Sequence, residues 1–144
     1  MKDTDLAWCA GIIDGEGTIT FKPIYNRLTT SIVPTIMLTM THEETVRHFK
    51  SIVKAGVVTK QSFSQSPNHK DKFVWICGNS TSAVLVVKLI EPYLITKKRQ
   101  AQLVLEFASK CIVGPGHRIS VEIEALRSIL FEEMKELNRK GPKS

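Results

Sequence analysis

The sequence predicts an α+β domain whose core runs helix, strand, strand, helix, strand, strand, helix. The apolar residues change from helical spacing to strict alternation and back in that order. A length of 144 residues also suffices for one domain with a sizeable core. We therefore expect a single domain over residues 1–144, with an αββαββα core over about 3–113, a four-stranded antiparallel sheet, and an additional C-terminal helix over about 119–138.

The first predicted helix is apolar on nearly all sides. Its face with the i, i+3, i+4, i+7 spacing comprises Leu6, Cys9, Ala10 and Ile13. Trp8, Gly11 and Ile12 cover the opposite side, and a helix of this kind is buried on both sides. We expect one side to pack in the chain's own core and the other against a second copy, where Ala10 and Gly11 let two backbones approach closely. We assign the four residues of the i, i+3, i+4, i+7 face to this dimer interface.

Two strand pairs and further helices follow. Residues 18–25 and 31–41 alternate polar and apolar side chains, as half-buried strands do. Thr41 and Glu44 have the spacing of a capping box, which predicts Thr41 as the N-cap of a helix that Gly56 ends. The remaining elements are expected at 57–64 and 72–77 for strands, and at about 80–90, 97–113 and 119–138 for helices.

Composition favours an anionic partner without requiring one. The net charge is +6 and the pI about 9.3, and the excess lies before residue 119, because residues 119–144 hold five basic and five acidic residues. Three widely separated cysteines exclude a disulfide framework and a C-x-x-C zinc site. No signal peptide or membrane-length apolar run is present. We therefore expect an intracellular protein that acts in the compartment where it is made, whether prokaryotic or phage cytoplasm or an organelle, with no membrane partner.

The segment from Cys9 to Gly17 reads C-A-G-I-I-D-G-E-G, an apolar helical run that ends in two acids with glycine after each. Gly15 and Gly17 let the backbone leave the helix sharply and leave room around Glu16 for a metal ion or a phosphate. The alternative is an ordinary helix end whose acids face water. The segment resembles the signature of the LAGLIDADG homing endonucleases, and the predicted order of elements agrees with that family's αββαββα fold over about the first 110 residues.

The resemblance implies a homodimer, because family members with one copy of the signature pair with themselves. It implies double-stranded DNA with a long pseudo-palindromic site as the partner, and Mg²⁺ or Mn²⁺ as the cofactor. Glu16 would be catalytic and would bind metal together with the carbonyl of Gly15, whereas Asp14 would be mainly structural. Glu16 of each copy would meet at the twofold axis, where shared cations could serve both scissile phosphates.

Two further residues match positions near the family's active site. Alignment through Pro92 and Ala101 places a catalytic lysine on Lys97, with Lys98 one register away; the alternative is an ordinary basic helix start. His42 matches a polar residue that orients solvent in some relatives. The alternative, which fits the sequence equally well, is that His42 is an ordinary residue in the first turn of a helix and faces water. Some relatives carry an arginine one turn later, where this chain has Val46 followed by Arg47.

DNA would be read by the outward faces of the strands. On the first hairpin the candidates are Thr20, Lys22, Tyr25, Arg27, Val33, Thr35, Met37 and Thr39. The register of the second hairpin is left open, and its candidates are Thr59, Lys60, Gln61, Lys72 and Ile76, with Lys98 as a further contact. Val33, Met37 and Ile76 could touch thymine methyl groups, while Arg27 and Gln61 could form bidentate contacts with bases.

Taken together, the residues and the resemblance predict a homing endonuclease that makes site-specific double-strand breaks by metal-dependent phosphodiester hydrolysis as a homodimer. The alternative is a nucleic-acid-binding module of the same fold that does not cleave, either an intron maturase that binds RNA or a regulator.

Overall fold

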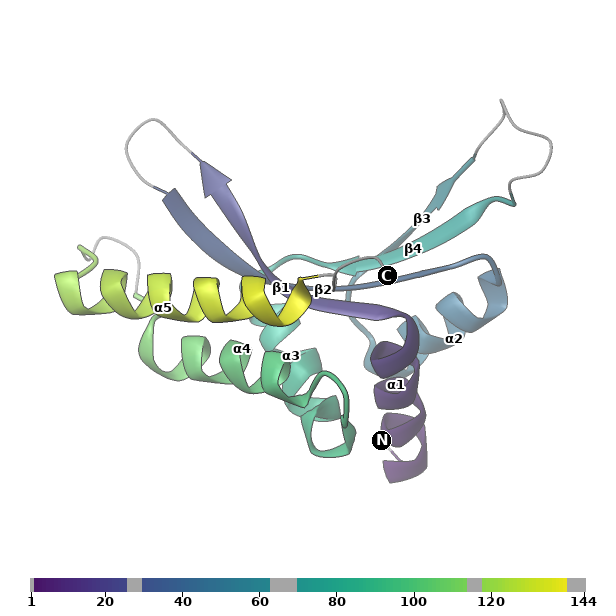
Figure 1. Cartoon of the computed structure of the whole chain (residues 1–144). Helices are drawn as coiled ribbons and strands as arrows, with labels where there is room; N and C mark the ends of the chain where they lie inside the picture. The colour runs from purple at the N-terminus through teal and green to yellow at the C-terminus, as the bar shows by residue number, and fades with distance from the viewer. Residues whose placement is uncertain (1, 26–29, 63–69, 114–117, 140–144) are drawn as a thin grey trace, which may run out of the picture.

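The computed structural model describes residues 2–25, 30–62, 70–113 and 118–139, and its elements follow the predicted order. The predicted α+β fold class is confirmed: an αββαββα core is followed by C-terminal helices (Figure 1). The elements are α1 (Asp3–Glu16), β1 (Gly17–Tyr25), β2 (Thr30–Met40), α2 (Glu43–Val53), β3 (Val57–Gln61), β4 (Lys72–Cys77), α3 (Ser80–Ile90), the 3-10 helix η1 (Glu91–Tyr93), α4 (Lys98–Lys110) and α5 (Val121–Asn138).

The four strands form one antiparallel sheet in the order β1-β2-β4-β3, so the two hairpins meet along β2 and β4. Leu38 pairs with Trp75 in this register, and both side chains are fully buried beneath the helices. Figure 1 shows the helices gathered on one side of the sheet, with the two hairpins flaring apart on the other side. One face of the sheet is therefore left uncovered by helices.

The junction between α1 and β1 has no connecting loop, and Gly17 makes this possible. A Cβ atom at Gly17 would lie 2.6 Å from Ile13 Cδ1 and 2.8 Å from Ile13 Cα. Its φ of −95° is open to any residue, so the requirement for glycine is close packing rather than backbone conformation. The end of α1 is consequently held directly at the start of the first strand.

The capping box predicted at Thr41 is wrong. The β2–β4 ladder continues to Met40, which pairs with Phe73, and residue 41 is a bend rather than a cap. His42 is the N-cap of α2, and its Nδ1 accepts a hydrogen bond from the Thr45 amide at 3.3 Å. The helix also ends three residues before Gly56, with Lys54 as its C-cap in the left-handed region (φ 56°).

Helix α5, whose role the sequence left open, packs on the core. Leu130 and Met134 are buried, and the Arg127 guanidinium donates to the Cys111 carbonyl at the end of α4. At the far end of α5, Asn138 Nδ2 donates to the Ile19 carbonyl at 2.9 Å. Because β1 is an edge strand, this contact lies along the sheet's outer edge.

The three cysteines are free and buried. Over residues 2–25, 30–62, 70–113 and 118–139, no helix combines the length and the apolar character needed to cross a membrane.

Candidate functional site

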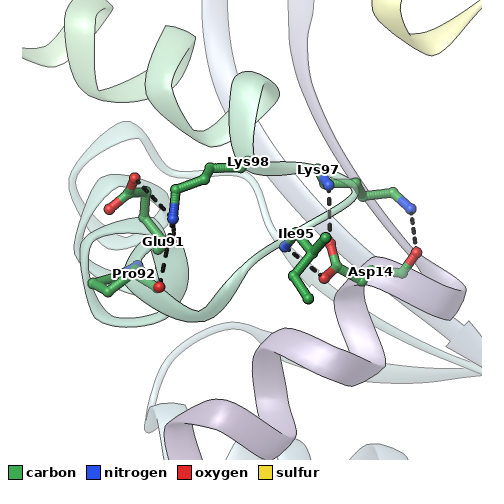
Figure 2. Close-up of polar contacts among 6 residues, drawn as sticks. All are labelled: Asp14, Glu91, Pro92, Ile95, Lys97 and Lys98. Atoms are coloured by element: carbon green, nitrogen blue, oxygen red, sulfur yellow. Dashed lines mark hydrogen bonds and ion pairs between the residues drawn. The ribbon is translucent and has the colours of Figure 1, made fainter.

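The carboxylate of Asp14, near the end of α1, binds the backbone that leads into α4. Its two oxygens accept hydrogen bonds from the Ile95 amide at 2.8 Å and the Lys97 amide at 2.9 Å (Figure 2). These bonds satisfy amides that precede or open a helix and would otherwise lack intrahelical partners. Asp14 therefore fixes residues 95–97 against α1, which agrees with the structural role expected of it.

The ammonium of Lys97 lies at the C-terminal end of α1, where its Nζ donates to the Asp14 carbonyl at 2.8 Å. A cation is favourable there, because the C-terminal end of a helix carries partial negative charge. Although Lys97 is the N-cap of α4, where a cation is disfavoured, its long side chain carries the charge away to α1. The Lys97 ammonium thus contacts a residue that precedes Glu16 by two positions in the sequence.

Lys98 is turned the other way (Figure 2). Its Nζ donates to the carbonyls of Glu91 at 3.2 Å and Pro92 at 3.4 Å, with the Glu91 carboxylate at 3.8 Å. These contacts hold the ammonium on η1 rather than on the uncovered face of the sheet. Of the two adjacent lysines, only Lys97 lies beside the end of α1, and Lys98 is not in the position expected for a DNA contact.

Glu16, the last residue of α1, is exposed and forms no hydrogen bond or ion pair with any residue in the described ranges. The helix ends here, so the Gly15 carbonyl has no intrahelical amide partner. A free carboxylate beside a free carbonyl is an oxygen donor set that suits a hard cation such as Mg²⁺. Among the described residues of one chain, no three His, Cys, Asp or Glu side chains come close enough to hold a metal ion.

His42 is exposed at the start of α2, and its Nδ1 also lies 2.7 Å from the Thr45 hydroxyl. Accepting the Thr45 amide leaves Nε2 free to carry the ring proton. No hydrogen bond joins His42 to Glu16 or Lys97 within the described ranges. Val46 is fully buried, and Arg47 forms an ion pair with Glu43, so neither supplies a free cation near the end of α1.

The register fixes which strand residues lie on the face that the helices leave uncovered. Directly paired residues share a face, and successive residues alternate. We call the following residues the open face: Thr18, Thr20, Lys22, Ile24, Ser31, Val33, Thr35, Met37, Thr39, Val57, Thr59, Gln61, Lys72, Val74 and Ile76. The register that the sequence left open therefore places Thr59, Gln61, Lys72 and Ile76 together on this face.

Some predicted DNA contacts do not fit the open face. Tyr25 pairs with residue 30 and Lys60 pairs with Phe73, so both belong to the opposite face. Lys60 also forms an ion pair with Asp71 at 3.2 Å. Thr35 is on the open face but only 3% exposed, with its hydroxyl donating to the Val33 carbonyl. Arg27 lies outside the described residues.

The expected dimer interface on α1 requires correction. The assigned residues Leu6, Cys9, Ala10 and Ile13 are buried within the single chain, with at most 8% of any side chain exposed. They pack in the core because they face the other helices and the sheet. The exposed residues of α1 are instead Asp3, Thr4, Ala7, Trp8, Gly11, Gly15 and Glu16.

Two glycines on that surface have no structural explanation within one chain. A Cβ atom added at Gly11 or Gly15 would meet nothing within 4 Å, yet glycine inside a helix costs about 1 kcal/mol relative to alanine. Their i, i+4 spacing on the side of the helix opposite Leu6 could have identified this surface from the sequence.

The αββαββα order, the four-stranded antiparallel sheet and the C-terminal helices match the fold of the LAGLIDADG homing endonucleases. One similar structure is the homing endonuclease I-CvuI in complex with its target in the presence of calcium, with a TM-score of 0.78 and 19% identity over 99% of this chain and 87% of that one. The archaeal intron-encoded homing endonuclease I-Vdi141I, in complex with DNA, has a TM-score of 0.78 and 19% identity over 100% and 90% of the two chains. The LAGLIDADG homing endonuclease I-GzeII, bound to its DNA target, has a TM-score of 0.60 and 12% identity, and the match covers 95% of this chain but 44% of that one. No protein-family model and no curated protein matches the sequence.

Proposed function

We propose that this protein is a homodimeric, metal-dependent endonuclease that makes double-strand breaks at a long pseudo-palindromic DNA site. The observation that carries the proposal lies at the point where α1 enters the open sheet. There the carboxylate of Glu16 is exposed and has no partner among the described residues, and the Lys97 ammonium is bound to the carbonyl of Asp14, two residues before Glu16 in the sequence. Phosphodiester hydrolysis needs groups that stabilise the negative charge developing on the scissile phosphate in the transition state. DNA complexes of the structurally similar endonucleases I-Vdi141I and I-GzeII support DNA as the substrate.

The dimer would form where two copies of α1 cross. Gly11 and Gly15 are exposed and would let two helix backbones come close, with Ala7 and Trp8 packing around them. Because Glu16 follows this surface directly, a twofold axis at the crossing would bring the two Glu16 side chains together. Two copies would then supply two carboxylates where one chain supplies a single one.

Glu16 and the Gly15 carbonyl would hold Mg²⁺ or Mn²⁺, which when bound neutralises phosphate charge and lowers the pKa of a water molecule. I-CvuI, one of the similar structures, has been crystallised with DNA in the presence of magnesium, although that DNA was not cleaved. Lys97 would stabilise the charge that develops on the scissile phosphate. His42 would orient solvent through its free Nε2 atom, because its Nδ1 is occupied by Thr45.

DNA would lie on the open face, with Lys22 and Lys72 contributing charge. Thr20, Val33, Met37, Thr39, Thr59, Gln61 and Ile76 would contact base edges in the major groove. Because phosphate contacts release counterions, binding would weaken steeply as salt concentration rises.

The test is selection from a randomised duplex library followed by cleavage of the selected DNA. The wild type should cut with Mg²⁺, whereas wild type with Ca²⁺ and Glu16→Gln with Mg²⁺ should bind without cutting. A matched control is Glu44→Gln, an exposed acid on α2 that should leave cleavage unchanged. Retention of DNA without cleavage under all conditions would instead support a non-cleaving binding module, and selective binding of intron RNA would support a maturase.

A further inference from the structure

The open face is poor in groups that recognise bases by directional hydrogen bonds. Of its fifteen residues within the described strands, Gln61 is the single amide and two are lysines, and none is Arg, Asn, Asp, Glu or His. Six others are aliphatic or methionine, and six carry hydroxyl groups, five of them threonines. Most of this surface therefore consists of methyl and methylene groups.

The apolar side chains form a continuous row. Met37 on β2 pairs with Ile76 on β4, and Ile76 pairs with Val57 on β3. Val74 lies on the same face two residues from Ile76, opposite Thr39. None of these four residues packs against the core, and Val57 is 58% exposed. The row thus presents apolar surface at the middle of the sheet.

Such a row suits one feature of the DNA major groove, the C5 methyl group of thymine, because the other base edges there present hydrogen-bonding atoms. Lysines on the same face and a net charge of +6 suit the surrounding phosphates. We propose, building on the proposed function, that this protein selects its DNA mainly through thymine methyl groups that face the row Met37–Ile76–Val57. Thr39 and Thr59 lie on the same face, two residues from Met37 and Val57, and their methyl groups would add further apolar contacts with thymine.

The experiment removes methyl groups from DNA without changing base pairing. The wild type selects a consensus from a randomised duplex library with Ca²⁺, and each consensus thymine is then replaced by deoxyuridine. Loss of one contacted methyl group should weaken binding about fourfold, since burying a methylene group contributes about 0.8 kcal/mol. At the same positions, 5-methylcytosine paired with guanine should bind more tightly than cytosine. Deoxyuridine at positions without base preference is the internal control.

A pair of protein variants tests the residues. Ile76→Asn introduces an amide that can pair with adenine, so the preferred base at one position of each half-site should change from thymine. The matched control Leu85→Asn makes the same kind of change on the surface of α3, where Leu85 is 56% exposed, and should leave the consensus unchanged.

The outcomes separate this inference from the proposed function. If no DNA is selected, the proposed function itself fails. If DNA is selected and cut, but every deoxyuridine duplex binds within about twofold of its parent, the methyl readout is overturned and the nuclease assignment stands. The deoxyuridine series uses wild-type protein, so it decides the question even if Ile76→Asn does not fold.

Discussion

Replacing Asp14 by alanine tests whether this carboxylate holds residues 95–97 in place. Its two oxygens accept the Ile95 amide at 2.8 Å and the Lys97 amide at 2.9 Å. A hydrogen bond to a charged group contributes about 1.5–3 kcal/mol, and the low end applies because the bond to Ile95 is solvent-exposed. Loss of both bonds should therefore lower the free energy of unfolding by about 3 kcal/mol. Asp14→Asn, which keeps one acceptor oxygen, should lose about half as much.

Urea denaturation at a fixed protein concentration measures this loss. With a slope near 2 kcal/mol/M, the midpoint for Asp14→Ala should fall by about 1.5 M. Asp71→Ala is the matched control, because it removes an aspartate whose ion pair with Lys60 is about half exposed and worth less than about 1 kcal/mol. A loss below about 0.5 kcal/mol for Asp14→Ala, or equal losses for the two variants, would refute the anchoring role.

Three further predictions concern α1 and α4. Gly11→Val should fold, because nothing lies within 4 Å of the added Cβ atom, but should sediment as a monomer; a stable Gly11→Val dimer would place the interface elsewhere. Lys97→Met should lower the cleavage rate about 100-fold while DNA affinity in Ca²⁺ stays nearly unchanged, and Lys98→Met, the control, should cleave normally. Burial, with a smaller effect of the nearby Asp5 charge, raises the pKa of the Cys9 thiol from its ordinary 9.0 to about 12. The unfolded thiol loses its proton first, so stability should decline between pH 9 and 12, and urea midpoints for Cys9→Ala should lack that part of the decline.

The order of helices and strands could be predicted from the sequence because spacing alone determines which side chains share a face. The N-cap of α2 could not, because the choice between Thr41 and His42 depends on how far the β2–β4 ladder extends. The register of the second hairpin could not be predicted from the sequence either. It is set by which residues pair across the sheet, such as Val58 with Trp75, and no local sequence signal between the two strands specifies it.

The candidate site came from two separate parts of the sequence: the motif indicated Asp14 and Glu16, and the alignment through Pro92 and Ala101 indicated Lys97. The contacts of Asp14 could not be predicted, because they join it to the backbone of residues 95–97, more than 80 positions away. The surface of α1 was misassigned because both sides of the helix are apolar. Only the packing distinguishes them: Leu6 and Ile13 fill the core, whereas a Cβ atom added at Gly11 or Gly15 would meet nothing within 4 Å.

The contact between Asn138 and the Ile19 carbonyl has a consequence for solubility. β1 lies at the border of the sheet, and an unprotected border strand is a template on which strands of other molecules can add. Helix α5 shields this edge in two ways: Asn138 occupies the Ile19 carbonyl of β1, and Leu130 and Met134 are buried in apolar contact with the core. A chain shortened before Val121 would expose this template and aggregate, whatever activity its remaining residues could support.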